Sequence, residues 1–504
     1  METKNTLERI NNFKYYLVLE GLAVGLIAGC AVSLFRVLIN YGEELRGYVT
    51  RDFSLWTVLF FIAMYLIVVA SLKYEPNCSG SGIPQVKGEL AGKMRVSSPK
   101  LLLTKILGGA AAISAGFSVG REGPSVQIGA MSGKAFSRLT KRLQTEQRLL
   151  ITTGAGAGLS AAFNAPLAGV VFSLEEIHKN WSLELMLSSM SACIASDFVS
   201  SYIFGLSPVF DIELEQVMPL SSYWLLILLG LVLGLFGVLY NNTIKLIQMA
   251  YSYIKPMPVK VAIPLVLTGI LAYFYPYVLG GGNALIDDLA ASSWELKALI
   301  ILLAAKFVFS MISFGSGAPG GIFLPLLVLG GITGSIFALA TGNEMYVSNF
   351  IVLGMAGYFT AIVRSPITGI ILISEMTGSL SHLLSLSVVC LVAYVVADLL
   401  KAQPIYEQLL DALLKKKHKA PNRKVMLESF IQVGSIMDGR PLVQMNMPKG
   451  ALIISIQRDE NEIVPSGETV LRADDRLLIL CNENMIQEIE KHLYNMAEAS
   501  ANDN

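Results

Sequence analysis

Long apolar runs follow one another along most of the chain, from residue 15 to residue 400. Clear examples are the runs 56–72, 185–204, 224–240, 259–277 and 296–314. A helix needs about 20 apolar residues to cross a bilayer, and about 17 can suffice. The pattern therefore predicts an all-α polytopic membrane region with room for about ten or more spanning segments. The first run is too long, and too closely followed by others, to be a cleaved signal peptide.

The pattern changes after residue 400. A basic run at 415–419 closes a helical stretch, and the following Pro421 and Asn422 are typical of a linker. Short β-rich runs separated by turn residues then follow at 429–433, 451–457, 462–464 and 476–481. Residues 484–496 have helical spacing. These features predict a small soluble α+β domain of about 80 residues.

Composition and charge support a membrane protein and argue against several other classes. Of the 504 residues, 53% are hydrophobic and 15% are charged, whereas soluble proteins carry about 25% charged residues. The net charge of zero gives no electrostatic case for binding nucleic acid. The five cysteines and four histidines are dispersed without metal-ligand spacing, so we predict no catalytic metal site. Basic residues near the N-terminus, at 138–148 and at 415–419 predict that both termini are cytoplasmic.

The membrane region contains an internal repeat. Six residues recur with the same residue type 201 positions later: Lys105, Gly116, Gly120, Pro124, Gly129 and Gly133. Five more recur 200 positions later: Gly154, Ala161, Pro166, Gly169 and Glu175. A duplication of this kind is typical of transporters, whose sites lie between the halves near the middle of the membrane. For the glycines alone, close helix packing is the alternative explanation.

The repeat and the change of pattern together predict the domain organisation. The membrane domain covers 1–415, with two inverted-topology helical repeats of broken helices. Its halves cover about 15–210 and 215–410, and a linker at 416–425 leads to the soluble domain at 426–504.

Three glycine-containing segments that end in proline interrupt the apolar pattern. They are Gly80, Ser81, Gly82, Ile83 and Pro84; Gly120, Arg121, Glu122, Gly123 and Pro124; and 317–325, which includes Gly321, Ile322, Phe323 and Pro325. Proline suits the first turn of a helix, and glycine permits an irregular backbone before it. Each segment therefore predicts a helix N-terminus at membrane depth, whose free N–H groups would bind an anion.

Two acidic positions within the apolar pattern are candidates for function, because a carboxylate in a membrane helix is costly. Glu122 lies in the second segment, and a cap for its own helix is the alternative role. Glu175 has the repeat partner Glu375, which indicates an architectural role in both halves. Glu176 has no acidic partner, which favours a special role over a solvated helix-end carboxylate. Arg121 is better explained as a structural partner than as an anion ligand.

At these segments the sequence resembles the CLC family of chloride channels and transporters, over about residues 15–410. The family's three signature stretches, GSGIP, GREGP and GxFxP, stand in order at 80–84, 120–124 and 321–325. The resemblance implies transport of chloride through a homodimer in the lipid bilayer, with one complete pathway in each subunit. We also predict a multi-pass protein of a bacterial plasma (inner) membrane.

The resemblance implies a role for each site residue. Ser81 would donate its hydroxyl to a central chloride, and Ile322 and Phe323 would offer backbone N–H groups. Tyr406, which follows the last membrane helix, would reach back to the same ion. Glu122 would be the gating and external proton glutamate, and Glu176 the internal proton glutamate of the exchanger branch.

Two positions depart from the family's pattern. Gln85 and Lys87 stand where relatives often carry acids. The sequence does not indicate what this departure changes.

The soluble region resembles the C-terminal RCK domain of bacterial potassium transport proteins and other carriers. Three stretches, at 448–454, 463–465 and 471–477, carry this resemblance. It implies dimerisation and a small regulatory ligand, for which cyclic di-AMP is a candidate.

We therefore predict voltage-sensitive chloride transport by chloride/proton exchange, without enzyme activity or a cofactor. A passive gated chloride channel is the alternative within the same fold. A cation carrier component is a remote alternative, because helix N-termini repel cations and no potassium-filter sequence is present. An enzyme is the weakest interpretation, since no nucleophile or metal constellation accompanies the two glutamates.

Overall fold

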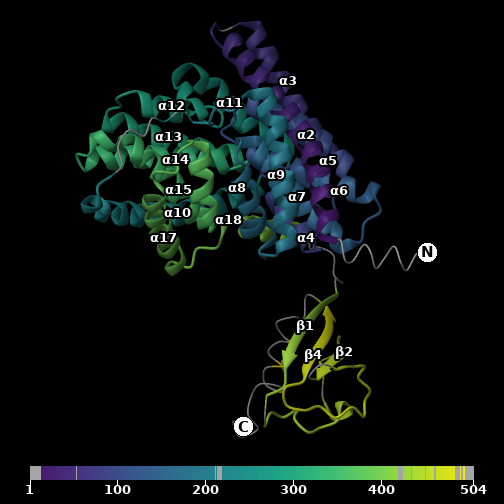
Figure 1. The fold of residues 1–504 in the computed structure, drawn as a ribbon. Coiled ribbons are helices and arrows are strands. Elements are labelled where there is room, and N and C mark those ends of the chain that lie inside the picture. Colours follow the sequence, from purple (N-terminus) through teal and green to yellow (C-terminus); the bar gives the residue numbers. More distant parts are fainter. Residues whose placement is uncertain are drawn as a thin grey trace. The chain divides into compact units, whose positions relative to one another are not determined.

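The computed structural model describes residues 13–52, 54–210, 212, 218–417, 424–432, 434–445, 447–448, 450–458, 461–482, 489, 492–493 and 496. The chain divides between Asp411 and Ala412 into a helical unit and a C-terminal unit (Figure 1). Each unit has its own hydrophobic core. The predicted linker lies largely outside the described residues, so its limits remain a prediction.

The helical unit begins with the elements of the first half. In chain order these are α2 (Phe13–Val49), α3 (Leu55–Tyr74), α4 (Ile83–Leu90), α5 (Ser98–Ser114), α6 (Glu122–Leu139), α7 (Gln144–Phe163), α8 (Pro166–Phe172), the π-helical segment η2 (Ser173–His178) and α9 (Leu183–Phe204). Helices α6 and α7 pack against each other, as do α2 and α9.

The second half has a similar order. Its helices are α10 (Tyr223–Ser252), α11 (Met257–Phe274), α12 (Asn283–Ala291), α13 (Leu296–Gly315), α14 (Phe323–Ala340), α15 (Val347–Val363), α16 (Pro366–Met376), α17 (Leu383–Leu399) and α18 (Ile405–Lys417). Helices α14 and α15 lie side by side, as α6 and α7 do in the first half (Figure 1).

Equivalent hydrogen bonds recur in the two halves, and one backbone bridge joins them. Gly120 and Gly321 exchange backbone hydrogen bonds in an antiparallel bridge, and both N···O distances are 2.7 Å. The buried ammonium of Lys105 donates to the carbonyls of residues 78 and 80, and that of Lys306 donates to those of residues 278 and 280. The offset of about 200 positions thus relates contacts as well as residue types.

Some of the repeated glycines serve close helix packing, as the alternative explanation proposed. A Cβ atom on Gly129 would lie 2.1 Å from the carbonyl oxygen of Gly154. The equivalent atom on Gly330 would lie 2.4 Å from the carbonyl oxygen of Gly354. Larger residues would therefore push α6 from α7 and α14 from α15, because backbone atoms cannot yield as a flexible side chain can.

The apolar runs predicted the long helices well, with differences at their ends. Within the described residues, eight helices are long and apolar enough to cross a membrane, and α16 and α17 are shorter apolar helices. Helix α10 continues beyond residue 240 as a more polar helix, whereas α11 ends at Phe274 because Pro276 follows closely. Helices α6 and α7 are long but rich in small and polar residues, which are tolerated where protein surrounds them.

The C-terminal unit contains a four-stranded antiparallel sheet in the order β1-β4-β2-β3. Its strands are β1 (Lys424–Phe430), β2 (Ala451–Arg458), β3 (Asn461–Ile463) and β4 (Arg476–Asn482). Alternate residues of the central strand β4 (Leu477, Ile479 and Cys481) are buried in the core, as a period of two predicts.

One strand prediction was misplaced. The first strand occupies Lys424–Phe430 rather than 429–433, because its exposed face mixes Lys424 and Glu428 with Met426 and Phe430 and so blurs the alternation. The predicted helical segment at 484–496 lies mostly outside the described residues.

Candidate functional site

All three glycine segments lead directly into helices. Helix α4 begins at Ile83 after Gly82, α6 begins at Glu122, and α14 begins at Phe323. Pro84, Pro124 and Pro325 each lie in the first turn, where a missing N–H costs nothing. The prediction of three helix N-termini is therefore confirmed.

The three segments converge at one point of the helical unit. A Cβ atom on Gly123 would lie 2.4 Å from the hydroxyl oxygen of Ser81 and 3.2 Å from the Cα atom of Gly321. Backbone bonds also join the first and third segments: Gly80 N–H donates to the carbonyl of Gly317, and Gly320 N–H donates to that of Gly80. Residues more than 200 positions apart thus meet where the helices begin.

This convergence gathers N–H groups that helix geometry leaves free. The first N–H groups of an α-helix have no carbonyl one turn earlier to bond with. At α14 these belong to Ile322 and Phe323, which are both buried. The ring of Phe323 packs between those of Phe163 and Phe359, with centroid separations of 5.5 and 4.7 Å. The aromatic packing fixes the position of this helix N-terminus.

The side chains near this point include buried polar groups without partners. Within the part of the chain that the structure describes, the hydroxyls of Ser81 and Tyr406 make no hydrogen bond, and the Glu122 carboxylate has no side-chain partner but faces backbone N–H groups at the beginnings of α6 and α14. Ser81, Glu122 and Tyr406 are nevertheless buried, with exposed fractions of 3%, 0% and 0%. Buried polar groups are normally satisfied, so these atoms indicate a place for a bound polar species.

Glu122 lies at the point where the two halves meet. Its Oε2 atom would be 2.1 Å from a Cβ atom on Gly120, which would also contact Leu324 at 3.1 Å. Gly120 must therefore lack a side chain for the carboxylate to lie against the beginnings of α6 and α14. The positive ends of both helices favour a negative charge there.

Arg121, beside Glu122, was predicted as a structural partner. Its backbone carbonyl accepts a hydrogen bond of 2.9 Å from the hydroxyl of Ser125. Its buried Nε atom has no hydrogen-bond partner among the described residues. No contact of this side chain tests its predicted role.

Glu176 lies in η2 in a different environment. Its Oε1 atom accepts a hydrogen bond from the ammonium of Lys87 at 2.5 Å, and its Oε2 atom accepts one from the hydroxyl of Ser365 at 3.0 Å. Tyr406 is close enough to interact electrostatically with both Glu176 and Glu122. Sequence reasoning noted Lys87 only as a departure from a pattern, and it missed Ser365.

Glu175 points to a different part of the fold from its neighbour. Its carboxylate accepts hydrogen bonds from the N–H groups of Ile367 and Thr368, in the first turn of α16. Its repeat partner Glu375 accepts equivalent bonds from Leu167 and Ala168, in the first turn of α8. These reciprocal bonds agree with the predicted architectural role.

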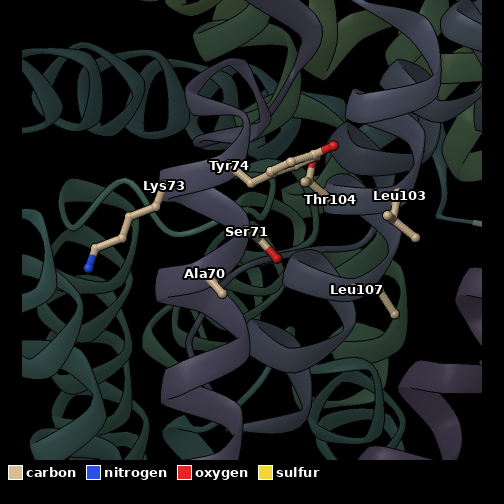
Figure 2. A pocket seen from close by; sticks show the side chains of 7 residues that line it. All are labelled: Ala70, Ser71, Lys73, Tyr74, Leu103, Thr104 and Leu107. Carbon is tan, nitrogen blue, oxygen red and sulfur yellow. The ribbon is translucent and has the colours of Figure 1, made fainter.

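A separate groove lies on the helical unit between α3 and α5. Its volume is about 500 Å³, and its lining is mostly apolar (Figure 2). The lining residues are Ala70, Ser71, Lys73, Tyr74, Leu103, Thr104 and Leu107. None of the predicted site residues lines this groove.

Comparison with known proteins adds two family matches. Residues 66–398 match the family described as voltage gated chloride channel, and residues 426–494 match the TrkA-C domain. The chain is 34% identical to the H(+)/Cl(-) exchange transporter ClcA of Vibrio parahaemolyticus, over 80% of this chain and 90% of that protein. It is 32% identical to the transporter of the same name from Citrobacter koseri, over 80% and 89%.

Solved structures resemble the helical unit. A slow cyanobacterial Cl-/H+ antiporter matches with a TM-score of 0.74 and 32% identity, over 80% of this chain and 99% of that one. A CLC-type fluoride/proton antiporter matches with a TM-score of 0.69 over 78% of this chain and 97% of that one, but its 22% identity speaks for the fold alone.

Proposed function

Because the chain belongs to the voltage gated chloride channel family, we propose that it exchanges chloride for protons across a bacterial inner membrane. The observation that carries this proposal is the convergence of three helix N-termini beside the buried carboxylate of Glu122. Free N–H groups and hydroxyls can bind a halide ion. A carboxylate beside them can take up and release the proton that moves in the opposite direction.

We assign the roles at the site as follows. The hydroxyls of Ser81 and Tyr406 and the N–H groups of Ile322 and Phe323 bind the central chloride. Such a site has no lysine or arginine contact, which keeps affinity moderate enough for release. The unpaired hydroxyls, both buried, support this assignment.

Glu122 acts in this scheme as the gate and the external proton acceptor. As a carboxylate it competes with chloride for the positive ends of the helices. When it is protonated it loses this attraction and leaves the position to the anion. Glu176 takes protons from the cytoplasmic side and passes them towards Glu122.

Exchange of this kind is voltage-sensitive for a simple physical reason. Chloride and protons that move in opposite directions carry electrical charge in the same direction. Each elementary charge moved across the membrane contributes about 2.3 kcal/mol per 100 mV. The membrane potential therefore drives or opposes every cycle.

The chain has a membrane domain and a regulatory domain joined by a linker. The membrane domain covers 1–415, the linker 416–425 and the regulatory domain 426–504, with both termini in the cytoplasm. We assign a homodimer with one pathway in each subunit. The TrkA-C match supports regulation by a small ligand, for which cyclic di-AMP is the candidate.

The test is flux measurement in liposomes with opposing chloride and proton gradients. A chloride electrode and a pH-sensitive reporter follow both ions on the same sample. We expect chloride moving down its gradient to drive protons uphill in the wild type. Glu176→Gln, which keeps the size of the side chain but cannot carry a proton, should abolish proton movement and leave most of the chloride flux.

A passive chloride channel is the second candidate, favoured by the ion pair between Lys87 and Glu176. A carboxylate held by an ammonium resists taking up a proton. Chloride flux without proton movement at every pH tested would overturn exchange and select the channel.

A further inference from the structure

A buried ion pair joins two elements that frame the site. Lys87 lies on α4, the helix that begins just after Ser81, and Glu176 lies in η2. The distance from Lys87 Nζ to Glu176 Oε1 is 2.5 Å, and the exposures of the two residues are 8% and 3%. The two positions are 89 residues apart in the chain.

Other groups also face the Glu176 carboxylate. The hydroxyl of Ser365, at the beginning of α16, donates to Oε2 at 3.0 Å. The ammonium of Lys179 acts on Glu176 through its charge, but it forms its own ion pair with Glu407 of α18. The hydroxyl of Tyr406 lies within electrostatic range. Among the residues that the structure describes, Lys87 is therefore the cation in direct contact with this carboxylate.

The ion pair affects any proton that would bind to Glu176. Burial of the carboxylate favours its neutral form, whereas the ammonium in contact favours the ionised form, and water screens that attraction little. Protonation of Glu176 would neutralise one partner and leave the ammonium of Lys87 buried without a counter-charge. An uncompensated buried charge is strongly unfavourable.

We propose that Lys87 is a positioning residue that opposes the protonation of Glu176 and thereby restrains the entry of protons at the inner end of the pathway. This inference rests on the proposed exchange function. Lys87 does not carry the transported proton in this scheme. Each proton that enters must break the contact between Nζ and Oε1, so the ion pair sets the pH at which entry becomes effective.

The chain offers a matched control on the same helix. Glu89, also on α4, forms a buried ion pair with Lys134, whose ammonium also donates to the carbonyl of Val96 at 2.6 Å. Lys134→Gln therefore removes a buried lysine from a glutamate of α4 without touching Glu176. Any general effect of such a loss on folding or on α4 is measured by this variant.

The experiment measures proton flux in liposomes against the pH of the inner side, at a fixed chloride gradient. In Lys87→Gln the pH of half-maximal flux should rise by about one to three pH units relative to the wild type. Lys87→Arg, which keeps the positive charge, should retain the wild-type profile, and so should Lys134→Gln. If Lys87→Gln does not fold, Lys87→Met takes its place.

A second measurement does not depend on transport. Infrared titration of the purified protein follows the protonated carboxyl band that Glu176→Gln removes. This band should develop at higher pH in Lys87→Gln than in the wild type.

The outcomes separate this inference from exchange itself. If Lys87→Gln shows coupled flux with the pH profile and infrared titration of the wild type, the role of Lys87 is overturned. Exchange itself then remains supported. Proton flux that appears only in Lys87→Gln supports the restraint. Absence of proton flux in every variant overturns both proposals.

Discussion

Glu175 and Glu375, which lie 200 positions apart, each cap a helix in the opposite half of the membrane unit. Glu175 bonds to two N–H groups of α16, and Glu375 bonds to two N–H groups of α8, at distances between 2.7 and 3.2 Å. A carboxylate at a helix N-terminus satisfies free donors and interacts favourably with the helix dipole. The two halves are thus joined by the same interaction made twice.

Loss of either carboxylate charge should destabilise the folded protein by a similar amount. We expect Glu175→Gln and Glu375→Gln each to cost about 1–2 kcal/mol, because charge-assisted bonds are replaced by neutral ones. Thermal unfolding of the purified protein measures the effect. Glu184, exposed in the first turn of α9, supplies the control, and Glu184→Gln should change little. Equal stability of all three variants would contradict the capping role.

Removal of the charge at Glu122 should uncouple chloride flux from proton flux. Glu122→Gln keeps the shape of the side chain but cannot ionise or compete with chloride. We expect chloride flux to continue and proton coupling to be lost in liposomes. A Glu122→Gln protein that still drives protons uphill under a chloride gradient would rule out this residue as the external proton acceptor.

The hydroxyls of Ser81 and Tyr406 should each contribute modestly to chloride affinity. Ser81→Ala and Tyr406→Phe each remove one hydrogen bond to the proposed ion, worth about 0.5–1.5 kcal/mol. Each variant should therefore bind chloride about twofold to tenfold more weakly by calorimetry. Unchanged affinity in the double variant would argue against this position of the ion.

Truncation tests whether the C-terminal unit only regulates. A chain that ends after Lys417, the last residue of α18, retains every residue assigned to the pathway. We expect it to insert into the membrane and to carry chloride, while its response to a regulatory ligand is lost. The measurement is chloride flux with and without cyclic di-AMP. Well-folded truncated protein that carries no chloride would show that the domain is needed for transport.

The C-terminal unit should become less stable in acid, because its buried carboxylate at Asp475 becomes protonated. Asp475 accepts two hydrogen bonds of 2.7 Å from Arg458 and one of 2.8 Å from the N–H of Arg472. Burial alone would raise the pKa of Asp475, but these bonds outweigh burial and hold its pKa below the usual value. A lowered pKa stabilises the fold above the unfolded-state pKa of about 3.9, and this contribution is lost as the pH falls below it.

A matched pair of arginine variants tests this prediction. Arg458→Met leaves Asp475 buried without its charged partner, which should cost about 3–5 kcal/mol at neutral pH and less in acid. Arg476→Met breaks the exposed pair with Glu428 and should cost about 0.5 kcal/mol or less. Limited proteolysis of the full chain between neutral and acidic pH follows the C-terminal unit. Similar protease sensitivity of both variants would contradict the prediction that the buried pair contributes more stability than the exposed pair.

The sequence by itself determined the local features of this protein. The long helices follow from runs of apolar residues, and the three helix N-termini follow from glycine and proline at fixed positions. These properties depend on neighbouring residues, so they can be read along the chain. The repeat was also visible because it preserves residue types at a nearly constant offset, and the strand β4 was visible as an apolar run at 477–481.

Only the tertiary structure decided which distant residues meet. The pairs Lys87 with Glu176 and Gly120 with Gly321, and the caps provided by Glu175, join positions between 89 and 201 residues apart. Nothing in a single sequence fixes such distances, because they depend on the path of the whole chain. For this reason Lys87 was only an unexplained departure in the sequence, whereas the fold makes it the charged partner of Glu176.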